Sequence, residues 1–211
     1  RQLQRIFERA GWLVVREPCD TNRYLTVARR DFATYLEGRP GQLRTTLKRK
    51  AKKVEVQIAE RFDAAIWDAY EAIYAESWKP EEGDPTLLRA FAEAEGAAGR
   101  IRLAVARQEG EAIAAQFWTV EDGTAYIHKL AHRESAKPLS PGTTLTAALL
   151  EHVIDRDGVD LVDFGTGDDG YKRDWMEQAR PRFLLQCWRK GDPRNWPAIA
   201  KRRLRKLVSV E

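Results

Sequence analysis

Apolar residues recur every three or four positions in several stretches of the chain, which is the spacing of one face of an α-helix. The first such stretch predicts a helix over residues 43–58, beginning after Pro40 and Gly41. A second predicts a helix from an N-cap at Asp63 to Lys79, before Pro80, and a third covers about residues 85–96. The first part of the chain is therefore expected to be largely helical.

The pattern changes after residue 100 to short apolar segments separated by polar turns. Segments 101–107, 112–120 and 124–131 predict a three-stranded antiparallel meander. Near the start of the chain, segments 12–17 and 23–28 predict two further short strands, divided by a turn that begins at Pro18.

The meander is followed by alternating helices and strands. The sequence predicts a helix after Gly142 that closes near Gly158, then a buried strand, a short helix starting near Asp168, a strand at 183–188 and a basic helix at about 197–208. This order predicts an α/β (α+β) fold with a mixed, mainly antiparallel sheet flanked by helices.

Composition narrows the class of protein. A chain of 211 residues, 43% of them hydrophobic, is long enough for one domain, or for one domain with part of a neighbour. It has no apolar run of about 18 residues and no apolar leader, so we expect a cytoplasmic protein without a membrane span. Because the first residue is Arg1 and not Met, we expect either a processed protein or a piece of a longer one. Cys19 and Cys187 lie far apart without zinc-ligand spacing, so no metal site is expected.

Positive charge gathers in two places. Residues 39–53 contain seven Lys or Arg residues and no acid, and residues 201–206 form a second basic cluster. Such patches suit partners that carry phosphate, but each could equally be the solvated face of an amphipathic helix.

Four local strings carry a resemblance to a known family. They are Ser77-Trp78-Lys79, the strand Tyr126–Ala131, the loop Leu139–Thr143, and Asp168–Trp175. Together, over roughly residues 40–190, they resemble the Fem-like and cellulose-biosynthesis-associated acetyltransferase domains of the GNAT superfamily.

The resemblance also implies a domain organisation. Two GNAT modules often lie in tandem in that family. Residues 1–37 would then be the tail of a preceding GNAT-like module, or N-terminal strands. Residues 38–190 would form the GNAT-like domain, and residues 191–211 a basic C-terminal helix.

The resemblance implies a bacterial N-acyltransferase that moves an acyl group from acetyl-CoA or another acyl-CoA to an amine acceptor, such as a cell-envelope or polysaccharide precursor. The helix N-terminus that holds the donor's pyrophosphate in the superfamily corresponds here to Ser140, Gly142, Thr143 and Thr144. Pro141 removes one N–H from this loop, which departs from the general superfamily pattern. Fem-type relatives use aminoacyl-tRNA, which is the alternative donor.

Three residues near the end of the domain are catalytic candidates, one of them by resemblance. Tyr171 corresponds to a tyrosine that protonates the leaving thiolate in many GNAT enzymes, although it could instead be an aromatic packed near Trp175. Lys172 could stabilise an oxyanion or bind phosphate. Asp168 or Asp169 could act as a base or cap the following helix, and capping is the favoured role of Asp168.

Acceptor-site candidates are Trp78, Lys79 and Lys129. Because side chains alternate along a strand, we expect His128 and Lys129 to point to opposite faces, with Lys129 in the cleft. His152 falls on the apolar side of its helix and is expected in the core.

Two readings from other classes stay open. The basic segments could make the chain a nucleic-acid-binding module, although it has no zinc-finger spacing or RNA-binding aromatic string. A GNAT scaffold without catalytic activity is the third hypothesis.

Overall fold

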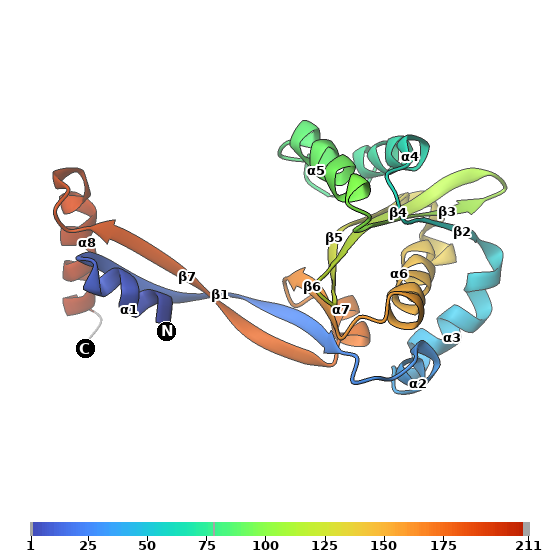
Figure 1. The fold of residues 1–211 in the computed structure, drawn as a ribbon, viewed down its shortest axis with the longest axis horizontal. Helices are drawn as coiled ribbons and strands as arrows, with labels where there is room; N and C mark the ends of the chain where they lie inside the picture. Colours follow the sequence, from blue (N-terminus) through green and yellow to red (C-terminus); the bar gives the residue numbers. More distant parts are fainter. Residues whose placement is uncertain (1, 78, 209–211) are drawn as a thin grey trace. The chain divides into compact units, whose positions relative to one another are not determined.

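The computed structural model describes residues 2–77 and 79–208. The chain forms two compact units: a larger unit of residues 22–179, and a smaller one of residues 1–21 together with 180–211 (Figure 1). Residues 22–37 lie in the larger unit, so the boundary expected near residue 37 does not coincide with the boundary between the units.

A seven-stranded sheet organises the fold, in the order β2-β3-β4-β5-β6-β1-β7. Strands β5 and β6 run parallel, whereas the pairs β2–β3, β3–β4, β4–β5 and β1–β6 are antiparallel. The fold is therefore the predicted mixed, mainly antiparallel α/β type. The strands are β1 (Trp12–Thr26), β2 (Glu55–Ala59), β3 (Ile101–Gln108), β4 (Glu111–Glu121), β5 (Thr124–His132), β6 (Leu161–Thr166) and β7 (Gln178–Arg189).

Helices cover both faces of the sheet in the larger unit (Figure 1). On one face, α4 (Ala64–Ala75) and α5 (Pro85–Ala97) form a core with the meander around the fully buried Trp67 and Phe117. The other face is covered by α2 (Phe32–Glu37), α3 (Gly41–Lys50) and α6 (Pro141–Glu151), which enclose the core around Trp118. A π-helical turn, His152–Arg156, extends α6, and α7 (Gly170–Trp175) follows β6.

The predicted meander is confirmed, as are the helices at 85–96 and after Gly142 and the strand that follows them. Asp63 caps α4 as expected, because its carboxylate accepts a 3.0 Å hydrogen bond from the Ile66 N–H. However, α4 ends at Ala75 rather than Lys79. His152 is buried, as predicted.

The prediction of one helix over residues 43–58 is wrong. Helix α3 ends at Lys50, residues 51–53 form a 3₁₀ turn, and residues 55–59 form β2. The strand pairs with β3, so that Ile58 lies opposite Ala104. Pairing with the edge of the sheet satisfies the backbone of this segment, and this tertiary contact outweighs the helical spacing of Val54 and Ile58.

The turn expected between two N-terminal strands is also wrong, because β1 runs without interruption from Trp12 to Thr26. Residues 18–20 are exposed. A proline is tolerated in a strand where its missing N–H is not needed by a neighbour. The two short helices α1 (Gln2–Arg9) and α2 were not predicted.

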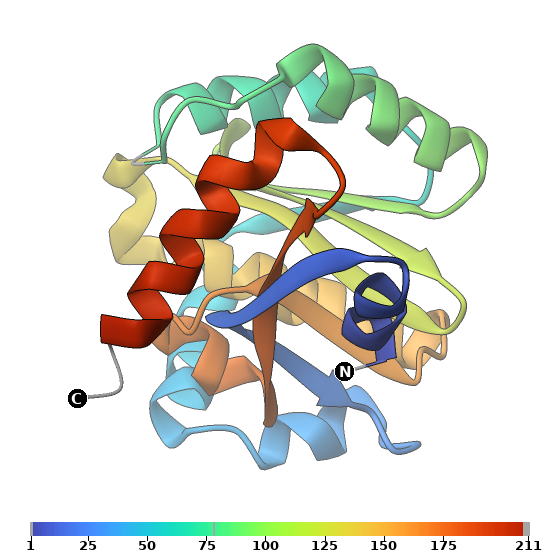
Figure 2. The same ribbon diagram turned by 90° about the vertical axis from the view of Figure 1, so that its left-hand side faces the viewer.

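The smaller unit consists of α1, the first part of β1, the last part of β7, a 3₁₀ turn at Pro193–Asn195 and α8 (Trp196–Val208). Helix α8 lies beside the two strands (Figure 2), where Arg202 pairs with Glu17 at 2.7 Å and donates to Gln186 at 2.6 Å. This unit holds 14 of the 36 Lys and Arg residues but only 5 of the 32 Asp and Glu residues. None of the described helices is both long and apolar enough to cross a membrane.

Candidate functional site

The candidate site begins where two neighbouring strands separate. Strands β5 and β6 pair only through residues 124–126 and 161–163, after which β5 continues to His132 and β6 to Thr166. Side chains of β5, the N-terminus of α6 and α7 enclose a cavity of about 280 Å³ beside this divergence. We call it the α6 cavity, and its lining residues are Leu130, His132, Lys137, Ser140, Pro141, Gly142, Thr143, Thr146, Tyr171 and Trp175.

The N-terminus of α6 forms one wall of the α6 cavity. Ser140 adopts a left-handed conformation (φ 52°, ψ 48°), and its carbonyl accepts the N–H groups of Thr143 and Thr144 at 3.1 and 3.2 Å. Of the four predicted donor-binding residues, Ser140, Gly142 and Thr143 line the cavity. Thr144 is buried, and its hydroxyl lies 3.5 Å from the Ser140 carbonyl.

Two residues that the sequence analysis did not select hold this wall in place. Lys50, at the end of α3, donates a 3.0 Å hydrogen bond to the Ser140 hydroxyl. Gln116, buried on β4, donates to the Gly142 carbonyl at 3.0 Å and to the Thr146 hydroxyl at 2.8 Å. A glutamine between the apolar residues of this strand was a signal that the sequence offered, because a buried amide needs partners. The link to Lys50 depends on tertiary structure.

The charged side chains described at the α6 cavity are all positive. Lys137 lines it and Lys50 reaches its edge at Ser140, while none of the ten described lining residues is acidic. Lys137 is exposed, and its nearest acid, Glu134, lies 3.6 Å away and outside the lining. A helix N-terminus adds a partial positive charge. The cavity is therefore suited to an anionic group such as a phosphate.

Tyr171 belongs to the α6 cavity, together with the buried Trp175. Although Tyr171 is 43% exposed, partial burial of its side chain, and next the charge of Asp169, raises the pKa of the Tyr171 phenol to about 12. The phenol therefore stays protonated throughout the neutral range and can donate a hydrogen bond into the cavity.

The structure gives Asp168 a different role from the one favoured by the sequence. Helix α7 begins at Gly170 with Asp169 at the N-cap, so Asp168 is not the cap. Its carboxylate instead accepts from Arg23 at 2.7 Å and from Arg173 at 3.3 Å. The hydrogen bond from Arg23 holds the pKa of Asp168 below its usual value, which makes this carboxylate a weak base.

Lys172 is buried within the fold. Its ammonium donates to the Phe164 carbonyl at 3.0 Å and to the Thr166 carbonyl. These contacts attach α7 to the end of β6. Nearby, Asp163 accepts from the buried Asn22 at 2.6 Å and from the Gly165 N–H at 2.7 Å, which holds Gly165 in its left-handed conformation. The sequence analysis missed this pair, although an Asp inside a buried strand was its signal.

A second cavity, of about 450 Å³, lies on the other face of the sheet between α4, α5 and the loop that joins them. We call it the aromatic cavity because Trp67, Tyr70 and Tyr74 form its wall. The remaining lining residues are Glu71, Ala75, Lys79, Pro80, Glu81, Glu82, Pro85 and Leu88. It therefore contains three carboxylates and one ammonium among its described residues, the reverse of the α6 cavity.

The predicted acceptor residues meet at this second cavity. Lys79 lines it, and Lys129 forms a 2.7 Å ion pair with its Glu82. The Lys79 and Lys129 ammonium groups lie 5.9 and 5.6 Å from the Tyr74 ring centre. Burial, and then the charges of Lys129 and Lys172, lowers the pKa of Lys79. Trp78 lies outside the described residues.

The expectation that His128 and Lys129 point to opposite faces is wrong. On β4, consecutive residues Phe117 and Trp118 pair with Lys129 and Ile127, so His128 is an extra residue in β5. This β-bulge interrupts the alternation. His128 stacks on Phe117 on the α5 side of the sheet, and Lys129 reaches Glu82 on that same side. Burial lowers the pKa of His128, whose ring nitrogen lies 2.8 Å from the Thr119 hydroxyl.

No metal ligands gather at either cavity: among the residues described, no group of three His, Cys, Asp or Glu side chains is placed to hold a metal ion.

Comparison with known proteins agrees with this geometry. The family profile described as acetyltransferase (GNAT) domain matches residues 41–173, well over half of the chain. No curated protein matches the sequence. The chain is similar in fold to the solved structure of FemX, with a TM-score of 0.71 and 10% identity over 91% of this chain and 69% of that one.

Two other solved structures are also similar in fold. One is L-PGS from Bacillus licheniformis, with a TM-score of 0.61 and 13% identity over 94% of this chain and 68% of that chain. The other is the C-terminal domain of a putative lysylphosphatidylglycerol synthetase from Agrobacterium fabrum, with a TM-score of 0.63 and 14% identity over 90% and 66%. The chain spans about two thirds of the length of all three structures, and at these identities the likeness concerns the fold.

Proposed function

We propose that this chain, which belongs to the acetyltransferase (GNAT) domain family, transfers an acyl group from acyl-CoA to an amine acceptor. The observation that carries the proposal is the α6 cavity. A helix N-terminus, two lysines and a protonated phenol meet there at the point where β5 and β6 separate. The donor's phosphates would bind at Ser140, Gly142, Thr143 and Lys50, with its thioester toward Tyr171.

In the proposed reaction, the neutral amine attacks the thioester carbonyl, a C–N bond forms, the C–S bond breaks, and the amine loses one proton to a base. Lys79 lines the acceptor cavity, and its unprotonated fraction, which the lowered pKa increases, would accept that proton. Tyr171 would meet the departing thiolate. A phenol with a pKa of about 12 is a weaker acid than a thiol of about 8.5, so Tyr171 stabilises the thiolate as a hydrogen-bond donor more readily than by full proton transfer.

The acceptor would enter from the aromatic cavity. Its three carboxylates attract a cationic amine, and its aromatic wall can hold an apolar or cationic group. One of the similar structures is a domain of a putative lysylphosphatidylglycerol synthetase, and another is FemX. These names favour a cell-envelope precursor as acceptor, and an acyl-CoA donor favours a cytoplasmic location.

Aminoacyl-tRNA is the second candidate donor. The observation in its favour is the concentration of 14 Lys and Arg residues against 5 acids in the smaller unit. Such an excess attracts a polyanion, and its binding would weaken steeply with added salt.

Calorimetric titration with acetyl-CoA, in parallel with aminoacyl-tRNA at the same salt concentration, tests the donor. A Cβ at Gly142 would lie 3.4 Å from Leu130 in the cavity wall, so we expect Gly142→Leu to abolish acetyl-CoA binding. Gly41→Leu is the matched control, because that glycine also begins a helix and no atom lies within 4 Å of a Cβ there.

Micromolar acetyl-CoA binding that is lost in Gly142→Leu and kept in Gly41→Leu would support the proposal. Binding of tRNA alone would replace acyl-CoA by aminoacyl-tRNA. Absence of both would leave the non-catalytic scaffold.

A further inference from the structure

The short helix that presents Tyr171 is held from both ends. Helix α7 has only six residues, too few for a helix to be stable by itself, and its N-cap Asp169 makes no capping hydrogen bond through its side chain. Lys172 attaches its N-terminal side to the carbonyls of Phe164 and Thr166. The position of Tyr171 in the α6 cavity must therefore also depend on what holds the C-terminal end.

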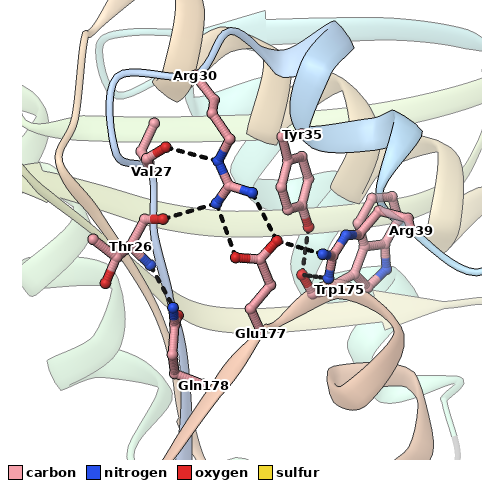
Figure 3. Close-up of polar contacts among 8 residues, drawn as sticks. All are labelled: Thr26, Val27, Arg30, Tyr35, Arg39, Trp175, Glu177 and Gln178. Atoms are coloured by element: carbon pink, nitrogen blue, oxygen red, sulfur yellow. Dashed lines mark hydrogen bonds and ion pairs between the residues drawn. The ribbon is translucent and has the colours of Figure 1, made fainter.

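That end is held by a cluster of charged residues centred on Glu177 (Figure 3). The Glu177 carboxylate accepts two hydrogen bonds from Arg30, at 2.8 and 2.9 Å, and a third from Arg39. A carboxylate bound by two guanidinium groups, one of them bidentate, is among the strongest polar contacts in proteins. Only 24% of the Glu177 side chain and 9% of the Arg39 side chain are exposed, so water screens these charges weakly.

The same cluster reaches the main chain immediately behind the α6 cavity. The Trp175 carbonyl accepts from the Tyr35 hydroxyl and, at 3.3 Å, from Arg39 (Figure 3). Trp175 is the last residue of α7, and its side chain lines the cavity with Tyr171. Arg30 also donates to the carbonyls of Thr26 and Val27, both at 2.9 Å. The segment of residues 26–39 is thereby joined to residues 175–177.

We propose that Glu177 is a positioning residue: by holding Arg30 and Arg39 against the end of α7, it sets where Tyr171 and Trp175 lie in the α6 cavity. The expected effect of Glu177 on the reaction rate rests on the proposed function. Its expected effect on the position of α7 does not. Glu177 is not among the lining residues of the cavity, so it would act through α7 and not by touching a ligand.

The test compares Glu177→Gln with a matched pair elsewhere. Asp157 also binds an arginine through both oxygens, with Arg102 at 2.6 and 2.8 Å, and both partners are almost buried. It lines neither cavity, so Asp157→Asn controls for the loss of a paired carboxylate. Tyr35→Phe, which removes only the hydroxyl bound to Trp175, is a milder second variant if Glu177→Gln folds poorly.

Amide hydrogen exchange tests whether Glu177 holds α7 in place. We expect faster exchange at residues 171–177 in Glu177→Gln and in Tyr35→Phe, and unchanged exchange there in Asp157→Asn. Unchanged exchange of this segment in the first two variants would overturn the inference, whether or not the protein is an acyltransferase.

Rates of acyl transfer test whether Glu177 affects catalysis through the position of Tyr171. Glu177→Gln should lower kcat about tenfold in the wild-type background, because small displacements of a catalytic group reduce rates strongly. It should have almost no effect in the Tyr171→Phe background, since Glu177 acts through Tyr171. An equal fall in both backgrounds would show a general destabilisation and overturn this role. Altered exchange in a protein without transferase activity would refute the proposed function and leave the positioning of α7 intact.

Discussion

The α6 cavity and the aromatic cavity lie on opposite faces of the same sheet and differ in almost every chemical respect. The first is lined by hydroxyls and one lysine at a helix N-terminus, has a second lysine at its edge, and has no acid among its described residues. The second has three carboxylates, one lysine and an aromatic wall. A phosphate-bearing donor and a cationic amine need such opposite surroundings. Under the proposed function, this contrast would keep two ligands of opposite charge on opposite faces of the sheet until they meet.

Residues near the end of β5 lie between the two cavities. Leu130 and His132 face the α6 cavity, while the bulge at His128 turns Lys129 toward Glu82 of the aromatic cavity. Lys79 is electrostatically coupled to Lys129 and to Lys172 of α7. An acyl group passing from one ligand to the other would cross this region.

The largest expected effect is a loss of catalytic rate without a loss of donor affinity. Tyr171→Phe removes the hydrogen-bond donor from the α6 cavity while keeping the ring, so kcat should fall on the order of 10²-fold. Donor affinity measured by titration should stay within about twofold. A large loss of donor affinity would instead make Tyr171 a binding residue.

Removing positive charge from the α6 cavity should have the next largest effect. Lys50→Met should weaken acetyl-CoA binding about tenfold, roughly the value of one charge-assisted hydrogen bond, and make it less sensitive to salt. Lys48→Met, an exposed lysine on the same helix, is the matched control. Equal losses in both variants would mean that the helix attracts the donor only through its overall charge.

The aromatic cavity should respond in the opposite way. Glu82→Gln removes a lining carboxylate and should raise the KM for an amine acceptor about threefold to fivefold, with donor affinity unchanged. Steady-state kinetics with each substrate varied in turn measures this split. If the donor KM rises instead, the assignment of the two cavities to donor and acceptor is reversed.

The smallest effect concerns the only lysine among the described residues of the aromatic cavity lining. Because the pKa of Lys79 is lowered in the folded protein, its charged form destabilises the fold at every pH below this folded pKa. The destabilisation disappears as the pH rises from the folded pKa to the ordinary value of 10.5. Lys79→Met should therefore raise the free energy of unfolding slightly at neutral pH, and the gain should shrink at alkaline pH. Urea unfolding at the two pH values would detect it, and a destabilised variant at neutral pH would contradict it.

Much of the α6 cavity could be predicted because its residues come from local strings. Ser140, Gly142 and Thr143 stand at a helix start, and Tyr171 lies on the next short helix, so a resemblance over a few residues located them. The roles of Asp168 and Lys172 were harder to assign. Their contacts with Arg23 and with the carbonyls at the end of β6 join distant parts of the chain.

The sequence by itself determined the fold class, the meander and the helices around it, because alternation and helical spacing report which face of an element is buried. Only the tertiary structure decided that β1 continues through Pro18, that residues 55–59 join the sheet as β2, and that Lys50 reaches Ser140. The last two depend on contacts between residues distant in sequence, and for residues 55–59 the pairing with β3 outweighs the local helical preference. The bulge at His128 was also decided by the tertiary structure, because the register between two strands depends on both of them.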